Sequence, residues 1–197
     1  ATVRDWLRLV ALAERHGVLA FVQRALHDVP LVPDTVHRAL QEGLTAVVLR
    51  QALLGDVLRR VLDVLGAAGV PVIVLKGPVL ARTLYPSAVF RPYGDLDLVV
   101  PAPGEDRAVA ALTAAGLREV PFAAEEARRL HACPDLDAAY HRVFQAAAGR
   151  AVVELHLDPL QLGLRPACEE ERWRRAVPVP DLPGALMLGA EDQLVHL

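Results

Sequence analysis

The sequence is poor in three features that would each indicate a particular class of protein: cysteine, positive charge and long apolar runs. Its two cysteines, Cys133 and Cys168, are far apart and lack metal-ligand spacing, which argues against a disulfide framework and favours a reducing cytoplasm. The formal net charge of −3 gives no general attraction to nucleic acid, so any polyanion would be bound locally. No apolar run reaches the length needed to cross a membrane.

Lysine is the scarcest charged residue. Lys and Arg together number 21, and all of these except Lys76 are arginine. The richness in arginine and alanine is typical of a GC-rich coding sequence. The single lysine therefore has two interpretations: it survives by chance, or an ammonium group is needed at that point of the chain.

The first third of the chain has the pattern of helices. Hydrophobic residues make up 53% of the sequence, enough for a sizeable core. Residues 3–28 are predicted to form two helices broken near Gly17. A long helix is predicted over 34–65, closed by Gly66 and Gly69. We expect these helices to be mainly packing elements.

From residue 70 the pattern changes to short strands and helices. The apolar run at 72–75 is typical of a strand covered on both faces, and a second strand is predicted over 96–100. Residues 140–147 and 151–157 flank a Gly-Arg pair and predict an antiparallel hairpin. A charged helix and a proline-rich connector are expected over 169–189.

The most informative segment is Arg-Pro-Tyr-Gly-Asp-Leu-Asp-Leu-Val-Val at 91–100. Side chains alternate along a strand, so Asp95 and Asp97 are expected to point to the same face. Two neighbouring carboxylates repel each other, and burial increases that repulsion. A divalent metal is the simplest compensating charge.

The strand predicted over 151–157 adds further ionisable residues. Its polar face carries Glu154 and His156, and the same period continues to Asp158. One interpretation is an exposed edge strand with a wet face. The other brings Glu154 beside the acidic pair as a third carboxylate, because three carboxylates can hold two Mg²⁺ ions about 3.5–4 Å apart.

A third candidate is the Lys76-Gly77 turn, which follows a strand and opens a helix. A helix N-terminus and an ammonium group at one point suit a polyphosphate, although an ordinary strand–helix turn explains the same residues. The spaced glycines of a Walker loop are absent. Arg91 could clamp a phosphate or simply neutralise Asp95.

These motifs, in this order, resemble an uncharacterised nucleotidyltransferase family of the DNA polymerase β-type nucleotidyltransferase superfamily. The resemblance rests on "Leu-Lys-Gly" ending at Gly77, "Arg-Pro-x-Gly-Asp-x-Asp" starting at Arg91, and "Glu-Leu-His" starting at Glu154. It implies an α+β fold: N-terminal helices over 1–69, then a small mixed β-sheet core with helices packed on it over 70–165.

The same resemblance implies that residues 166–197 begin a C-terminal helical region and that the chain is truncated. A "Glu-Asp-x-Leu" segment at 191–194 carries this expectation. Loss of the following helices would leave an apolar face that could pair two chains, so a homo-oligomer is possible.

The resemblance also implies an activity, transfer of a nucleoside monophosphate from an NTP such as ATP to a hydroxyl or similar acceptor on a small molecule, peptide or protein. Asp95 and Asp97 match its metal-binding pair, and Glu154 matches its third acid, giving a site for two Mg²⁺ ions. Lys76 and Gly77 stand where the superfamily has a Gly-Ser phosphate turn.

The resemblance does not explain two residues, Pro78 and His156. Pro78 replaces the usual serine of the phosphate turn and lacks an N–H. His156 has three possible roles: to orient Glu154, to assist the acceptor, or to fill the core. We also expect no contact with membrane or, beyond local contacts, with nucleic acid.

Two rival hypotheses follow from the same residues. The first is a nucleotidyltransferase fold that has lost catalysis and binds nucleotides or a partner, which the proline in the phosphate turn favours. The second is a metal-dependent hydrolase that uses Asp95, Asp97, His156 and Asp158. The transferase hypothesis requires Glu154 on the same face of the sheet as the acidic pair.

Overall fold

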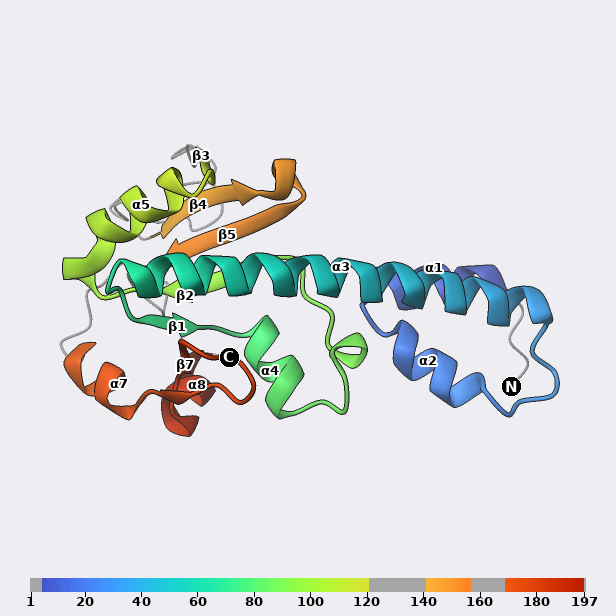
Figure 1. Ribbon diagram of the computed structural model, residues 1–197. Helices are drawn as coiled ribbons and strands as arrows, with labels where there is room; N and C mark the ends of the chain where they lie inside the picture. Colours follow the sequence, from blue (N-terminus) through green and yellow to red (C-terminus); the bar gives the residue numbers. More distant parts are fainter. Residues whose placement is uncertain (1–4, 121–140, 157–168, 197) are drawn as a thin grey trace, which may run out of the picture. The chain divides into compact units, whose positions relative to one another are not determined.

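The computed structural model describes residues 5–120, 141–156 and 169–196 (Figure 1). Contacts divide the chain into two compact units, one from 1–53 and 80–93 and one from 54–79 and 94–197. The first is called here the helical unit and the second the sheet unit. No helix among the described residues is long and apolar enough to cross a membrane.

The helical unit is built from amphipathic helices. Its elements are α1 (Trp6–Arg15), α2 (Leu19–Leu26), the first part of α3 (Asp34–Ala67) and the 3₁₀ turn η1 (Ala88–Phe90). The Asp5 side chain caps α1 by accepting a hydrogen bond of 2.9 Å from the Arg8 backbone N–H, as expected of a helix start. The predicted break between two short helices and the long helix that follows are both confirmed.

Contacts between distant segments hold the helical unit together. The break between α1 and α2 occurs at Gly17, whose φ of 66° suits glycine, and Pro92 lies so close that a Cβ there would meet its ring at 3.3 Å. Phe21 packs edge-on against Phe90 at 5.0 Å between ring centroids. Gln51 donates a hydrogen bond of 2.9 Å to the Tyr93 carbonyl. The segment before the acidic pair is therefore part of this unit.

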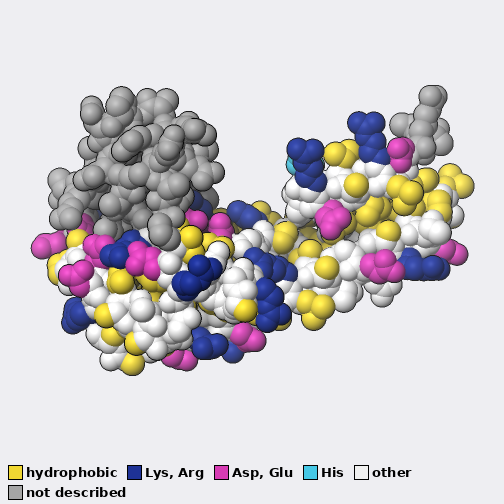
Figure 2. All heavy atoms as spheres, turned by 90° about the horizontal axis from the view of Figure 1, so that it is seen from above, with side chains coloured by type: hydrophobic (Ala, Val, Ile, Leu, Met, Phe, Trp, Pro, Cys, Tyr) yellow, Lys and Arg dark blue, Asp and Glu magenta, His cyan; other side chains and the backbone are white. Residues whose placement is uncertain are grey.

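The surface of the helical unit keeps many apolar side chains exposed. Figure 2 shows them gathered over the unit that carries α1 and α2. Leu7 is 69% exposed and Leu31 is 84% exposed. The buried cluster of the unit consists of Ala13, Leu19, Val32, Val36 and Leu40.

The sheet unit contains the remaining described elements and the second part of α3. Its helices and 3₁₀ turns are the start of α4 (Gly77–Thr83), η2 (Ala102–Gly104), α5 (Glu105–Ala114), η3 (Ala147–Gly149), α7 (Glu169–Arg175) and α8 (Ala190–His196). Its strands are β1 (Val72–Val74), β2 (Leu96–Val99), β3 (Arg118–Val120), β4 (His141–Ala146), β5 (Ala151–His156), β6 (Val177–Pro178) and β7 (Ala185–Met187).

The described strands form one mixed sheet of seven in the order β3-β4-β5-β2-β1-β7-β6. β2 runs parallel to β5 and antiparallel to β1, and β4 and β5 form the predicted antiparallel hairpin. All residues of β1 are buried, as its apolar run predicts, and all residues of β2 are buried too, Asp97 included, whereas the edge strands β3 and β6 are mostly exposed. An α+β fold with N-terminal helices and a mixed sheet is thus confirmed.

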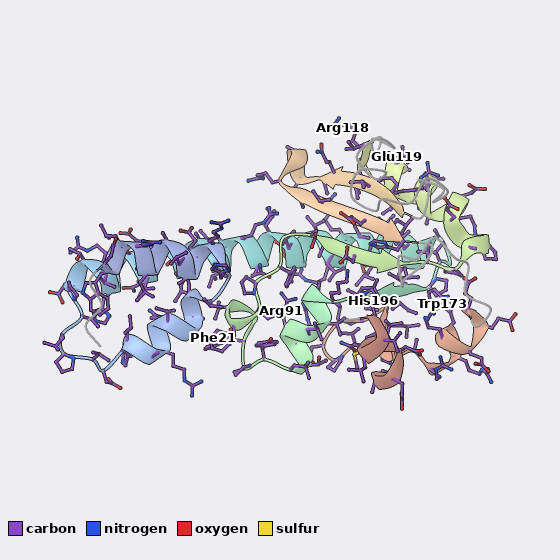
Figure 3. The ribbon with its side chains drawn as sticks, turned by 180° about the vertical axis from the view of Figure 1, so that it is seen from behind. Phe21, Arg91, Arg118, Glu119, Trp173 and His196 are labelled. Carbon is purple, nitrogen blue, oxygen red and sulfur yellow. The ribbon has the colours of Figure 1, made fainter. Side chains whose placement is uncertain are left out.

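One part of the sequence behaves differently from expectation. The proline-rich segment after α7, which we interpreted as a connector, contributes β6 and β7 to the sheet. β7 runs parallel to β1 with Val72 opposite Ala185. Trp173, which is labelled in Figure 3, packs on a buried cluster that includes Ile73, Leu75 and Leu188. The boundaries 1–69, 70–165 and 166–197 remain a prediction.

Candidate functional site

The two acids of the site are placed side by side by strand register. β2 and β5 pair in parallel with Asp97 directly opposite Glu154. Residues opposite each other in a ladder point to the same face of the sheet. Glu154 therefore lies on the same face as Asp97, as the transferase hypothesis requires.

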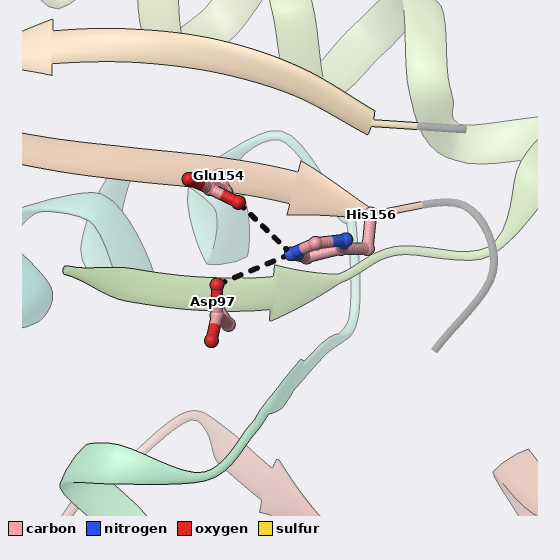
Figure 4. Close-up of side chains that lie close together, drawn as sticks. All are labelled: Asp97, Glu154 and His156. Atoms are coloured by element: carbon pink, nitrogen blue, oxygen red, sulfur yellow. Dashed lines mark hydrogen bonds and ion pairs between the residues drawn. The ribbon is translucent and has the colours of Figure 1, made fainter. Parts of the chain in front are cut away.

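His156 joins this face two residues further along β5. Its Nε2 lies 3.2 Å from Asp97 Oδ1 and 3.6 Å from Glu154 Oε2 (Figure 4). The His156 side chain is only 1% exposed. A carboxylate can only accept a hydrogen bond, so Nε2 carries the proton in its contact with Asp97.

Lys76 approaches Asp97 from the other neighbouring strand. Its Nζ lies 3.9 Å from Asp97 Oδ2, and the Leu75 backbone N–H donates a 2.9 Å hydrogen bond to the Asp97 carbonyl just before the turn. Lys76 has φ of 45°, a left-handed conformation that side chains other than glycine adopt only at a cost. The backbone is thus held in an unfavourable conformation at the residue whose ammonium group faces the acidic site.

Asp95 lies at the surface immediately before β2, since the strand begins at Leu96. The alternation of a strand therefore does not place its side chain. Partial burial raises the pKa of Asp95, and the nearby charge of Asp97 raises this pKa further. The ligand atoms that lie within 4.8 Å of one another come instead from Asp97, Glu154 and His156.

The pKa values of the two facing acids move in opposite directions. Burial raises the pKa of Glu154, and repulsion from Asp97 raises this pKa further. Burial also acts to raise the pKa of Asp97, but the hydrogen bond from His156 and attraction to His156 and Lys76 outweigh it, so this pKa lies below its usual range. The carboxylate charge is stabilised at Asp97 and poorly compensated at Glu154.

The donor atoms present fit a divalent cation. Two carboxylates and one imidazole converge within 4.8 Å, and all three are common metal ligands. The negative charge of Glu154 is poorly compensated, and a bound cation would compensate it.

A family model described as "Uncharacterised nucleotidyltransferase" matches residues 2–197. The chain belongs to this family. A comparison with curated proteins finds none that matches it.

The structure brings together most of the candidate residues expected of a nucleotidyltransferase. Asp97, Glu154 and Lys76 meet in the sheet unit, and Asp95 is near enough to affect their charges. Gly77 opens α4 and is followed by the buried Pro78.

Two other candidates are not placed at the site. Arg91 lies in the helical unit, where its guanidinium donates a 3.2 Å hydrogen bond to the Pro92 carbonyl. Asp158, which the hydrolase hypothesis needs, lies outside the described residues.

His196 on α8 also lies near the site, although it was not among the residues predicted from the sequence. This residue lines a pocket with Lys76, and it contributes to the lowered pKa of Asp97. The remaining walls of the pocket are Val74, Leu75, Val79, Leu188 and Gln193. No sequence signal points to His196, because its proximity depends on the docking of α8 through β7 onto β1.

Proposed function

We propose that this protein is a nucleotidyltransferase that transfers a nucleoside monophosphate from an NTP to a hydroxyl or similar acceptor. The observation that carries the proposal is the pairing of Asp97 with Glu154 on one sheet face, with Lys76 against the same aspartate, in a chain of this family. In the reaction an acceptor oxygen attacks the α-phosphorus, the bond to the β-phosphate oxygen breaks, and pyrophosphate leaves.

The acids hold the cations that such a transfer needs. Asp95, Asp97 and Glu154 would bind two Mg²⁺ ions, which lower the barrier by neutralising the phosphates and acidifying the attacking hydroxyl. Glu154 lies on β5, on the opposite side of β2 from Lys76 in the strand order. This arrangement suits an acceptor on the Glu154 side and the leaving phosphates on the Lys76 side.

Lys76 and the turn after it would bind the triphosphate. The side chain of Lys76 is one-third exposed, so its ammonium can reach a phosphate while staying near Asp97. Gly77 has no side chain to hinder an approaching phosphate. His156, which contacts both Asp97 and Glu154, would hold these acids in place beside the nucleotide.

A second candidate function is supported by one observation. Pro78 follows Gly77 at the start of α4 and has no N–H to donate to a phosphate. A nucleotide-binding module without catalysis would tolerate this residue more easily than an enzyme would. A measurement of nucleotidyl transfer distinguishes the enzyme from the binding module.

The decisive experiment follows transfer of label from α-³²P NTPs to candidate acceptors in Mg²⁺. The wild-type protein is compared with the double variant Asp95→Asn/Asp97→Asn and with Glu119→Gln. Glu119 is a matched control because it is an acid of the sheet unit that pairs with Arg142 away from the site.

Label transfer that disappears in the double variant and persists in Glu119→Gln supports the transferase. Nucleotide binding without transfer, for all four NTPs and a broad set of acceptors, favours the binding module. Transfer that survives in the double variant would overturn the proposed role of the acids.

A further inference from the structure

We infer that His156 is itself a metal ligand, so that the Asp97–Glu154–His156 group selects a first-row transition ion such as Mn²⁺ over Mg²⁺. This inference deepens the proposed function and rests on it. It concerns which cation one of the metal positions prefers and which atom of His156 binds it. The competing explanation is that His156 only hydrogen-bonds Asp97, which leaves the cation to oxygen ligands.

The separations of the donor atoms match those of ligands on a single ion. Two ligands at right angles around an ion, each about 2.1 Å from it, are roughly 3.0 Å apart, and tetrahedral ligands at about 2.0 Å are roughly 3.3 Å apart. His156 Nε2 lies 3.2 Å from Asp97 Oδ1 and 3.6 Å from Glu154 Oε2. The ligand atoms of all three residues lie within 4.8 Å of one another, so one ion could contact all three once the two acids have moved towards it.

The position of the imidazole is determined by the sheet. His156 is the last residue of β5 and lies opposite Val99 of β2 on one side and His141 of β4 on the other. Its side chain is 1% exposed, so it has no room to turn outward. An ion held by Asp97 and Glu154 would therefore meet Nε2 within its ligand shell, and Nε2 would bind it after releasing to solvent the proton that it donates to Asp97.

A buried nitrogen ligand changes which cation the site prefers. Mg²⁺ requires near-ideal octahedral geometry, favours oxygen and usually keeps several waters. Imidazole suits first-row transition ions such as Zn²⁺, Fe²⁺ and Ni²⁺, and Mn²⁺ is the weakest binder of that series. Mn²⁺ accepts carboxylates readily and is paramagnetic, so we choose it as the probe.

The test measures the bound ion directly. The full chain is produced with ¹⁵N-labelled or unlabelled histidine, loaded with Mn²⁺ at one equivalent, and examined by electron spin echo envelope modulation. We expect a ¹⁴N coupling in the unlabelled protein that is replaced by a ¹⁵N coupling in the labelled one. This measurement needs no substitution, so it does not depend on a variant that folds.

Calorimetry supplies the second readout. We expect Mn²⁺ to bind at least about tenfold more tightly than Mg²⁺. In His156→Asn the affinity for Mn²⁺ should fall by about 10–100-fold, with less than about threefold change for Mg²⁺. His27→Asn is the matched control, because His27 is exposed and lies in the helical unit; it should keep the nitrogen coupling and both affinities.

Mn²⁺ bound without histidine coupling, equal affinities for the two ions, or no binding of either ion would each overturn the inference. The outcome is separable from that of the proposed function. Histidine-coupled Mn²⁺ without nucleotidyl transfer supports the ligand assignment and contradicts the enzyme. Transfer in Mg²⁺ without nitrogen coupling supports the enzyme and contradicts the ligand assignment.

Discussion

Two of the places in the sheet unit where carboxylates surround a basic side chain are compensated very differently. At the first, Arg142 on β4 binds Glu119 through two contacts of 2.7 and 2.9 Å and approaches Glu105 at 3.5 Å. At the second, a single imidazole nitrogen faces both Asp97 and Glu154. The first is called here the arginine cluster and the second the acidic site.

The arginine cluster satisfies its own charges. The forked guanidinium matches the two oxygens of Glu119, and this hydrogen bond raises the pKa of Arg142 above its usual value. Glu119 lies on β3, whose residues are mostly exposed (Figure 3), so water provides further solvation. Nothing in this arrangement calls for another cation.

The acidic site leaves part of its charge uncompensated. Lys76 and His156 both contact Asp97, while burial and the neighbouring aspartate raise the pKa of Glu154. Evenly paired carboxylates indicate a structural ion pair, and unevenly paired ones under burial indicate a site that is completed by a ligand.

Asp97→Asn is expected to have the largest effect. It removes the carboxylate that faces Lys76 and His156, so divalent-cation affinity should fall by at least about 100-fold, and stability should fall by about 1.5–3 kcal/mol because a charged hydrogen bond is lost. Calorimetry and urea unfolding measure the two. Equal losses of cation affinity in Glu119→Gln would remove the distinction between the clusters.

Substitutions of Lys76 separate its charge from its backbone. Lys76→Met and Lys76→Gly both remove the ammonium, so NTP affinity should fall by about 10–100-fold in each. Only Lys76→Gly relieves the positive φ, so it should be more stable than Lys76→Met by about 1 kcal/mol. Lys76→Arg is the control that retains charge. Unchanged NTP affinity in both neutral variants would exclude a phosphate contact.

The pH dependence of stability should reveal the uncompensated charge at Glu154. Its pKa is raised in the folded state, so between the unfolded and folded pKa values the folded protein binds more protons and loses stability as pH rises. Metal-free wild type should therefore lose melting temperature relative to Glu154→Gln as pH rises from about 4.3. Excess Mn²⁺ should abolish this trend. A difference that does not change with pH would contradict it.

Arg142→Gln is expected to have the smallest effect. Both glutamates of the arginine cluster are partly exposed, and pairs of this kind contribute about 0.2–1 kcal/mol. Urea unfolding should show a loss in that range, and added Mn²⁺ should stabilise the variant no more than the wild type. Extra stabilisation by Mn²⁺ would show that freeing two acids is enough to create a cation site.

Local patterns predicted the elements well, because helix and strand periods are written in short stretches. The alternation of Val153, Glu154 and Leu155 identifies a strand with one polar face. The pairing of β5 with β2, and so the contact of Glu154 with Asp97, depends on residues far apart in the chain. The period of two indicates which residues of β5 share a face, but it does not indicate which distant strand lies beside β5.

Short or non-local features were harder to predict. β6 and β7 have two and three residues, too few to show an alternation. Asp95 precedes the strand rather than belonging to it, so the period-two argument does not apply to it. The approach of His196 to the pocket beside Lys76 depends on how α8 docks, which no local motif encodes.

The parallel pairing of β2 and β5 also determines when the site can exist during protein synthesis. Asp97 and His156 are 59 positions apart, so at about 5–20 residues per second the ribosome adds the second roughly 3–12 s after the first. Until β5 is made and has paired with β2, Glu154 and His156 are not in place beside Asp97, so the proposed metal site is incomplete. Ion binding at the proposed site would therefore report that β5 has paired with β2, before β7 and β6 are added to the other edge of the sheet.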